Sequence, residues 1–278
     1  MKQVLDSIDS HFHVVGNPDV FPLDGRRSYT PTQAPLERWR EILGPLGVTR
    51  GVVVQPSFYG TDNRALLAAL AQGEGCLRGV AAVDANVTDD ELERLGRAGV
   101  RGVRLAHFAG SEPRGLGGFV GFAAFSSLAP RLRERGMHVQ LITDSRLLPG
   151  IEREIGRFGV EVVIDHMGRT PVQLGFEHAG VTWLRRFLED GRGWVKLSGM
   201  ANLSALPFGY EDMRPLYELL VAANPERVVW GSDWPHTRAS SAEVDTAQLL
   251  KSCLEWTGDR QTLERVMRDN AQRLYSFH

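Results

Sequence analysis

The sequence predicts an α/β protein built as a single (β/α)8 TIM barrel that spans residues 1–278. Three observations predict this fold. Eight short runs of apolar and β-branched residues recur along the chain, helical patterns separate them, and polar residues follow most of the runs at their C-terminal ends. Strands that alternate with helices are typical of parallel sheets. One barrel of this kind needs about 250 residues, so a chain of 278 residues needs no second domain.

The eight runs are short enough to be strands and too continuously apolar for a sheet with one exposed face, so we expect parallel strands buried on both faces. The predicted strands are 8–9, 51–54, 79–83, 102–105, 138–142, 160–164, 194–197 and 228–230. Amphipathic patterns between them predict helices. Thr88 and Glu91, for example, have the spacing of a capping box and predict a helix start. Leu274 and Tyr275 belong to a predicted closing helix.

Composition excludes several classes of protein. The chain is 42% hydrophobic and 24% charged, which is ordinary for a globular domain. Its formal net charge is -2 and no basic run stands out, so we expect no nucleic-acid partner. No apolar stretch is long enough to cross a membrane or to form a signal peptide. Cys76 and Cys253 have no CxxC partner, which favours a reducing cytoplasm. The oligomeric state stays open.

Ionisable residues follow the predicted strands at one end, where the active sites of such barrels lie. His11 and His13 follow the first strand, and residues two apart on a strand point to the same face. His166 follows the sixth strand and Asp233 the eighth. We therefore expect these four side chains to converge.

Each of these residues also has a purely structural interpretation. A histidine can be a hydrogen-bonded core residue, Asp233 can cap a loop, Arg104 can be ion-paired and Arg169 can be solvated. Their recurrence at the same end of successive strands favours a site. Ser57 has no G-x-S-x-G context, and the glycines at 115–118 lack G-x-G-x-x-G spacing, so neither predicts its usual chemistry. The glycine-rich segment 110–121 is predicted to be an active-site loop.

Six motifs in order resemble the lactonase branch of the amidohydrolase superfamily: HFH at 11–13, VQPSFYGTDN at 54–63, IDHMGR at 164–169, WVKLSG at 194–199, WGSDWPH at 230–236 and DNAQRLYSF at 269–277. That branch includes 2-pyrone-4,6-dicarboxylate hydrolases and sugar-lactone hydrolases and isomerases. The resemblance implies a TIM barrel that acts on a small lactone without a metal.

The sequence departs from related patterns at three places. Strand four offers Arg104 where dinuclear amidohydrolases carry a bridging lysine. The exit of strand five is Ile142, where metal-dependent members place a histidine and pyrone hydrolases an aromatic hydroxyl. Asn202 follows strand seven where pyrone hydrolases carry an arginine, the usual partner of a carboxylate. The substrate therefore stays open.

The leading hypothesis is hydrolysis of a small carboxylated lactone with no cofactor. Asp233 is the expected general base, and His11, His13 and His166 are expected to stabilise the oxyanion. The expected substrate-binding residues are Arg104, Arg169, Ser57, Tyr59, Asn202 and His236. One alternative is isomerisation of a sugar-acid lactone. Another is a zinc-dependent amidohydrolase or decarboxylase, with Zn²⁺ held by His11, His13, His166 and Asp233. A non-catalytic ligand-binding barrel is the third.

Overall fold

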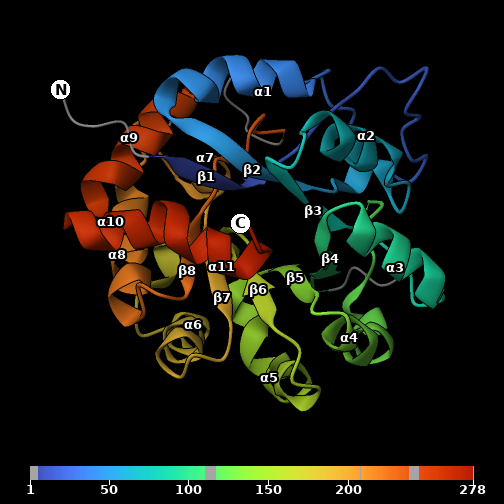
Figure 1. Ribbon diagram of the computed structural model, residues 1–278. Helices are drawn as coiled ribbons and strands as arrows, with labels where there is room; N and C mark the ends of the chain where they lie inside the picture. Colours follow the sequence, from blue (N-terminus) through green and yellow to red (C-terminus); the bar gives the residue numbers. More distant parts are fainter. Residues whose placement is uncertain (1–5, 110–116, 207, 238–243, 278) are drawn as a thin grey trace.

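Eight parallel strands form one sheet in the order β1 to β8 along the chain (Figure 1). The computed structural model describes residues 6–109, 117–206, 208–237 and 244–277. The strands are β1 Ser7–Phe12, β2 Val48–Val54, β3 Leu77–Ala81, β4 Val100–His107, β5 His138–Thr143, β6 Val162–Ile164, β7 Trp194–Leu197 and β8 Val228–Trp230. Each strand pairs with the next one in parallel register. The predicted TIM barrel is confirmed.

The barrel closes between its first and last strands. Phe12 forms a parallel bridge with Trp234. The His13 amide donates to the Trp234 carbonyl at 2.8 Å, and the Asp233 amide donates to the His11 carbonyl at 2.8 Å. These backbone bonds bring the His-x-His segment beside the segment that carries Asp233. The closing seam of the barrel therefore builds half of the predicted site.

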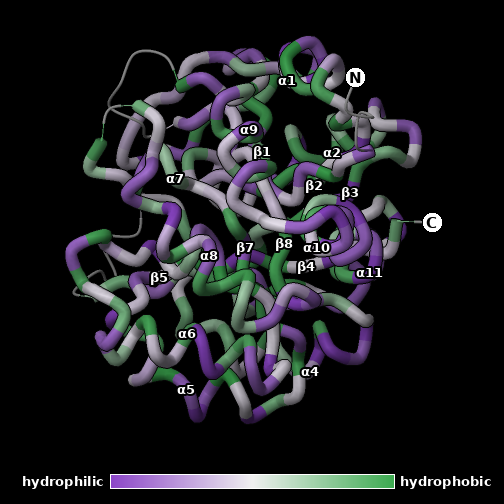
Figure 2. Tube along the Cα trace, turned by 90° about the vertical axis from the view of Figure 1, so that its left-hand side faces the viewer, coloured by the Kyte–Doolittle hydropathy of each residue, from purple (hydrophilic) through white to green (hydrophobic). Residues whose placement is uncertain are grey.

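Amphipathic helices cover the outside of the sheet, and hydrophilic residues alternate with hydrophobic ones along their traces (Figure 2). The Thr88 hydroxyl accepts a hydrogen bond from the Glu91 amide, as the capping pattern predicted. The helices are α1 Leu36–Leu43, α2 Arg64–Gln72, α3 Asp89–Arg97, α4 Phe125–Glu134, α5 Leu148–Arg157, α6 Ala179–Glu189, α7 Met200–Leu203, α8 Arg214–Ala223, α9 Thr246–Trp256, α10 Arg260–Glu264 and α11 Asn270–Tyr275.

Apolar side chains form two cores. The larger core lies between strands and helices, and Phe12 stacks there on Trp39 of α1 with ring centroids 4.4 Å apart. The smaller core lies inside the barrel, where Val52, Val80 and Val229 pack with Tyr275 of α11. The C-terminal segment thus lies across one end of the barrel (Figure 1). The opposite end carries the polar residues.

The observed strands differ slightly from the predicted ones. The third strand is Leu77–Ala81 rather than 79–83, and the sixth is Val162–Ile164 rather than 160–164. Val83 and Val160 are buried, so both belong to the apolar runs without pairing in the sheet. An apolar run in the sequence reflects burial of its side chains, whereas the bounds of a strand depend on backbone hydrogen bonds to its neighbours. Both cysteines are free, and no helix in the described ranges is long and apolar enough to cross a membrane.

Candidate active site

A pocket opens at the C-terminal ends of the strands, at the end of the barrel opposite α11. Its lining combines residues from the first, second, fourth, fifth, sixth, seventh and eighth strand ends. The lining residues are His13, Tyr29, Pro56, Ser57, Arg104, Phe119, Ile142, His166, Arg169, Asn202, Asp233 and Thr237. Residues 110–116 of the predicted active-site loop lie outside the described residues, and Phe119 from the same segment lines the pocket.

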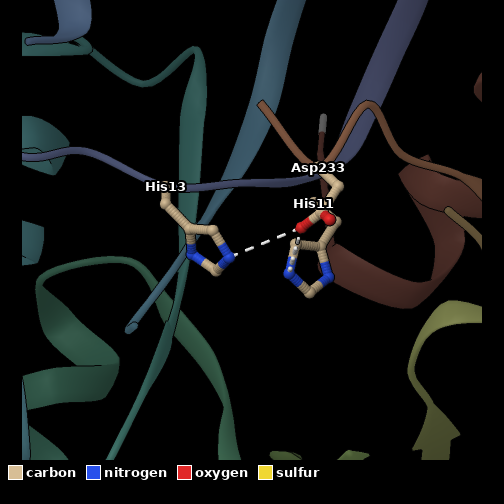
Figure 3. Close-up of side chains that lie close together, drawn as sticks. All are labelled: His11, His13 and Asp233. Atoms are coloured by element: carbon tan, nitrogen blue, oxygen red, sulfur yellow. Dashed lines mark ion pairs between the residues drawn. The ribbon is translucent and has the colours of Figure 1, made fainter. Parts of the chain in front are cut away.

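Three imidazoles converge on one carboxylate oxygen at the base of this pocket. The Nε2 atoms of His11, His13 and His166 lie 3.7, 3.6 and 3.8 Å from Oδ1 of Asp233. Figure 3 shows the rings of His11 and His13 both close to that carboxylate, His13 to its left and His11 below it. All four side chains are buried. The structure thus brings together the four residues that the strand ends predicted.

Two glycines make room for this convergence. A Cβ on Gly231 would lie 2.8 Å from the backbone nitrogen of His11. A Cβ on Gly199 would lie 2.6 Å from Nδ1 of His166, and Gly199 also has a positive φ of 72°. Each glycine belongs to a motif that follows a strand, WGSD in the first case and LSG in the second. The motifs therefore place an imidazole against bare backbone.

His166 and Asp233 adopt left-handed backbone conformations with φ of 53° and 61°. Such conformations are uncommon for residues other than glycine and cost about 1 kcal/mol or more each. They turn both side chains away from the strand direction and toward the pocket. Strained conformations of this kind cluster at functional sites.

In each imidazole, Nδ1 contacts a polar group on the side of the ring away from Asp233. His13 Nδ1 lies 2.8 Å from the Val54 carbonyl oxygen, which can only accept, so Nδ1 of His13 carries a proton. His166 Nδ1 bonds to the Ser198 hydroxyl at 2.9 Å, and His11 Nδ1 lies 3.3 Å from Asp165 Oδ1. These contacts fix the three rings so that Nε2 faces Asp233 in each case.

A buried network of charges lies behind His11. Arg104 binds Oδ2 of Asp165 through Nε and Nη2, both at 2.9 Å. Lys196 donates to the Ser10 carbonyl at 2.7 Å and to Gln140 Oε1 at 2.6 Å. Sequence reasoning had treated Asp165 and Lys196 only as strand-end residues, because which face a strand residue takes depends on the pairing register. Side chains of a strand point alternately to the inside and the outside of the barrel. Counting this alternation on the strands near His11 could have indicated that Asp165 and Lys196 point inward.

Burial and neighbouring charges set the protonation states of the site. Burial alone would raise the pKa of Asp233, but His166, the bond with His13 and His11 outweigh it and lower that pKa below its ordinary value. Burial lowers the pKa of His166 to about 4 and, with Lys196, holds the pKa of His11 well below its usual range. At neutral pH the site therefore holds an ionised carboxylate beside neutral His11 and His166.

The predicted substrate-binding residues separate into two groups. Arg104, Arg169, Ser57 and Asn202 line the pocket. The guanidinium of Arg104 packs over the Phe119 ring at 5.3 Å and that of Arg169 over the Phe108 ring at 5.9 Å. Asn202 Nδ2 donates to Asp233 Oδ2 at 3.0 Å.

Tyr59 and His236 do not line the pocket. The Tyr59 hydroxyl accepts a hydrogen bond from the Gly16 amide at 3.0 Å, and His236 Nε2 bonds to the Thr246 hydroxyl at 2.9 Å. Both side chains are buried in the wall of the barrel and support it.

Apart from Ile142 at the exit of strand five, four lining residues were not among the expected site residues: Tyr29, Pro56, Phe119 and Thr237. The hydroxyls of Tyr29 and Thr237 lie 2.9 Å apart. Tyr29 belongs to the long connection between β1 and α1, which has no periodic pattern to reveal its position. Thr237 directly follows the WGSDWPH motif, so its position at the end of strand eight was an available signal.

Three of the converging side chains could hold one small divalent cation. His11, His13 and Asp233 offer ligand atoms that all lie within 4.8 Å of one another, and imidazoles and carboxylates are common zinc ligands. The Nδ1 contacts of the two histidines also resemble the outer contacts of metal-binding histidines. His166 Nε2 lies 3.8 Å from Asp233 Oδ1 and is a fourth candidate outside that group. Ile142 offers no ligand at the exit of β5.

Comparison with characterised proteins identifies relatives along nearly the whole chain. A 2-pyrone-4,6-dicarboxylate hydrolase of Comamonas testosteroni is 31% identical over 278 residues, covering 97% of this chain and 90% of that protein. A 4-sulfomuconolactone hydrolase of Hydrogenophaga intermedia is 29% identical, covering 97% and 88%. A D-galactarolactone isomerase of Agrobacterium fabrum is 25% identical, covering 96% and 89%.

The fold agrees with these relationships. A crystal structure of a Pseudomonas putida protein superposes with a TM-score of 0.85 at 34% sequence identity, covering 99% of this chain and 98% of that one. The family model described as amidohydrolase matches residues 8–277. That match includes every strand of the barrel and all four converging residues. The chain belongs to the amidohydrolase family.

Proposed function

We propose that this protein hydrolyses a small carboxylated lactone and that Asp233 is the general base. The observation that carries the proposal is an ionised, buried carboxylate that faces three imidazoles in a pocket lined by two guanidiniums. The carboxylate can take a proton from water. The guanidiniums of Arg104 and Arg169 can bind a carboxylate of the substrate.

The reaction needs one water and returns its proton. Asp233 Oδ1 takes a proton from water as the water oxygen bonds to the lactone carbonyl carbon. The carbonyl oxygen becomes an oxyanion. When the ring C–O bond breaks, the proton on Asp233 passes to the departing ring oxygen, and the product is an open hydroxy acid. Asp233 is then ionised again, so the cycle balances.

The role of each imidazole depends on which of its two ring nitrogens carries the proton, because that decides whether Nε2 donates or accepts. His13 carries a proton on Nδ1, which faces the Val54 carbonyl, so Nε2 can hold the second hydrogen of the water when it carries no proton of its own. Ser198 can donate or accept, so His166 can carry its proton on Nε2 and donate to the oxyanion.

The relatives support lactone chemistry and leave two reactions open. Two of the three named above hydrolyse, and the third is an isomerase. In an isomerase, Asp233 would deprotonate a hydroxyl of the substrate in place of water. Asn202 beside Asp233 favours this second candidate, because an amide can hold a sugar hydroxyl.

We also propose that turnover needs no divalent metal or other cofactor. Ile142 supplies no ligand, and the Arg104 guanidinium lies behind the imidazole cluster, where it disfavours another positive charge. A zinc ion in the cluster would polarise the carbonyl and lower the pKa of a water. The proton-transfer role of Asp233 and the anion-binding role of the arginines would be the same in either case.

The test is Asp233→Asn against a panel of carboxylated lactones and pyrones. The amide cannot take a proton, so we expect kcat to fall by about 1,000-fold or more. Asp212→Asn is the matched control, since Asp212 binds Ser204 outside the pocket. Wild-type turnover by Asp233→Asn would remove Asp233 from the mechanism. NMR of the product separates an open acid from a rearranged lactone. Binding without turnover of any lactone by the wild type would instead favour a ligand-binding barrel.

A further inference from the structure

We propose that Asp165 is a positioning residue that holds His11 in the tautomer with its proton on Nδ1. Asp165 follows β6, one residue before His166, and is fully buried beside the His11 ring. The proton on Nδ1 leaves the lone pair on Nε2, which faces Asp233. The orientation of His11 then depends on a carboxylate that does not line the pocket.

The two oxygens of Asp165 have different surroundings. Oδ2 accepts from Arg104 through Nε and Nη2 at 2.9 Å each and from Gln140 Nε2 at 3.1 Å. These three bonds fix the plane of the carboxylate. Oδ1 is buried without a well-aligned hydrogen-bond donor among the described residues, and His11 Nδ1 lies 3.3 Å from it. The nearest group able to satisfy Oδ1 is therefore the His11 ring.

Lys196 is the competitor for the same ring nitrogen. Its Nζ lies 3.4 Å from His11 Nδ1, and a donation there would require a lone pair on Nδ1. Two of its three hydrogens are already used in shorter bonds to the Ser10 carbonyl and to Gln140. A lone pair on Nδ1 would also face the charged Oδ1 of Asp165, leaving that oxygen buried and unpaired at a cost of about 1–3 kcal/mol. The Nδ1-protonated tautomer pairs Oδ1 of Asp165 and leaves the buried Nε2 of His11 as an acceptor, to which no described residue donates.

Asp165 is kept ionised for this task. Two bonds of 2.9 Å from the Arg104 guanidinium to Oδ2 hold the carboxyl group as an anion. An ionised carboxylate accepts and cannot donate, so it selects one tautomer of its partner. The same logic applies to the carboxylate behind the histidine of a hydrolase triad.

The consequence is that His11 and His13 present matching lone pairs. Their Nε2 atoms lie 3.7 and 3.6 Å from Asp233 Oδ1. A water between them can donate one hydrogen to Asp233 and the other to an imidazole. This kinetic consequence rests on the proposed hydrolysis, whereas the tautomer of His11 does not.

The tautomer is measured directly by long-range ¹H–¹⁵N correlation NMR of the labelled protein at neutral pH. Spectra are recorded as purified and after chelation, and His11→Asn identifies the His11 signals. We expect the wild type to carry its proton on Nδ1. In Asp165→Asn, the amide oxygen can still accept from Arg104, so its NH2 group faces the ring and we expect the proton to move to Nε2.

Asp9→Asn is the matched control. Asp9 is a fully buried carboxylate in the same barrel. It accepts from Ser232, from Trp39 and from the backbone amide of His11, so it holds the His11 backbone and not the His11 ring. We expect this variant to lose stability and to keep the wild-type tautomer of His11. If both variants lose a similar amount of stability and only Asp165→Asn changes the His11 tautomer, the change of tautomer does not come from the loss of a buried charge.

In the kinetic arm, we expect Asp165→Asn to lower kcat by about 100-fold or more while KM changes by less than about threefold. A wild-type ring protonated on Nε2, or an unchanged tautomer in Asp165→Asn, would overturn the inference. If the variant does not fold, the wild-type spectrum alone decides. If no lactone is turned over, the proposed function fails while the spectra still test the role of Asp165.

Discussion

Asn202 Nδ2 donates a hydrogen bond of 3.0 Å to Oδ2 of Asp233, the oxygen that faces away from the three imidazoles. The imidazole nitrogens all approach the other oxygen, Oδ1. The hydrogen bond to Oδ2 therefore orients the carboxylate, and Oδ1 is the oxygen that faces the imidazoles. Asn202 thus orients the carboxylate that we propose as the general base.

We expect Asn202→Ala to lower kcat by about 10- to 100-fold, because a hydrogen bond to a charged group contributes about 1.5–3 kcal/mol. KM should change little, since the lost bond orients the base. Steady-state kinetics on the best substrate of the panel checks this. Ser204→Ala, whose hydroxyl binds Asp212 outside the pocket, is the control. A loss confined to KM would mean that Asn202 acts on the substrate alone.

We expect replacement of the two pocket arginines to have different effects on the kinetic constants. Arg104 binds Asp165 through two nitrogens, whereas the Arg169 guanidinium packs over the Phe108 ring. We expect Arg169→Met to raise KM for a carboxylated lactone by about 10-fold or more and to leave a neutral lactone unaffected. Arg104→Met should lower kcat for both substrates and reduce stability, because it leaves a buried carboxylate partly unpaired.

The measurements are kinetics on a charged and an uncharged lactone, together with chemical unfolding of each variant. Equal effects of Arg169→Met on both lactones would count against a carboxylate-binding role. A purely KM effect of Arg104→Met would show that its bond to Asp165 does not support the site.

His138 should make the protein sensitive to acid. Burial and the nearby Lys196 lower its pKa to about 3, although Asp165 acts in the opposite direction. The ring also packs on Tyr275 with centroids 5.4 Å apart. The folded-state pKa lies below that of the unfolded chain, so the folded protein binds fewer protons. Stability is then fully present above about pH 6.5 and falls as the pH drops toward the folded-state value.

We expect His138→Gln to make this decline shallower by up to about 1.4 kcal/mol per pH unit. Urea unfolding at several values of pH between about 4 and 7 measures the slope. The variant can be less stable at neutral pH, so the slope and not the absolute value is compared. Identical slopes for the two proteins would show that His138 does not contribute.

Chelation tests metal independence. We expect full activity after exhaustive chelation, with no zinc by elemental analysis of the active protein. Loss of activity that returns in proportion to added Zn²⁺ would overturn this prediction, and the ligands would then come from the four converging residues. If the enzyme does need Zn²⁺, His13→Asn should also abolish zinc binding, because it removes a ligand.

The fold was predictable because apolar runs and helical periodicity are local properties of the sequence. Convergence of His11, His13, His166 and Asp233 was also predictable, because parallel strands end at one face of a barrel. The pairing of Asp165 with Arg104 was not, since it depends on which side chains of three strands share a layer. Tyr59 and His236 show the same limit, because closeness to a motif does not reveal whether a side chain faces the pocket or the wall.

Tyr275 and its apolar neighbours fill the end of the barrel opposite the pocket. Substrate therefore arrives, and product departs, by the same mouth. The proposed opening of a lactone creates an additional carboxylate, so the product would be more anionic than the substrate while it still lay beside Arg104 and Arg169. The residence time of the product would then limit turnover, and accumulated hydroxy acid would compete with fresh lactone for the two arginines.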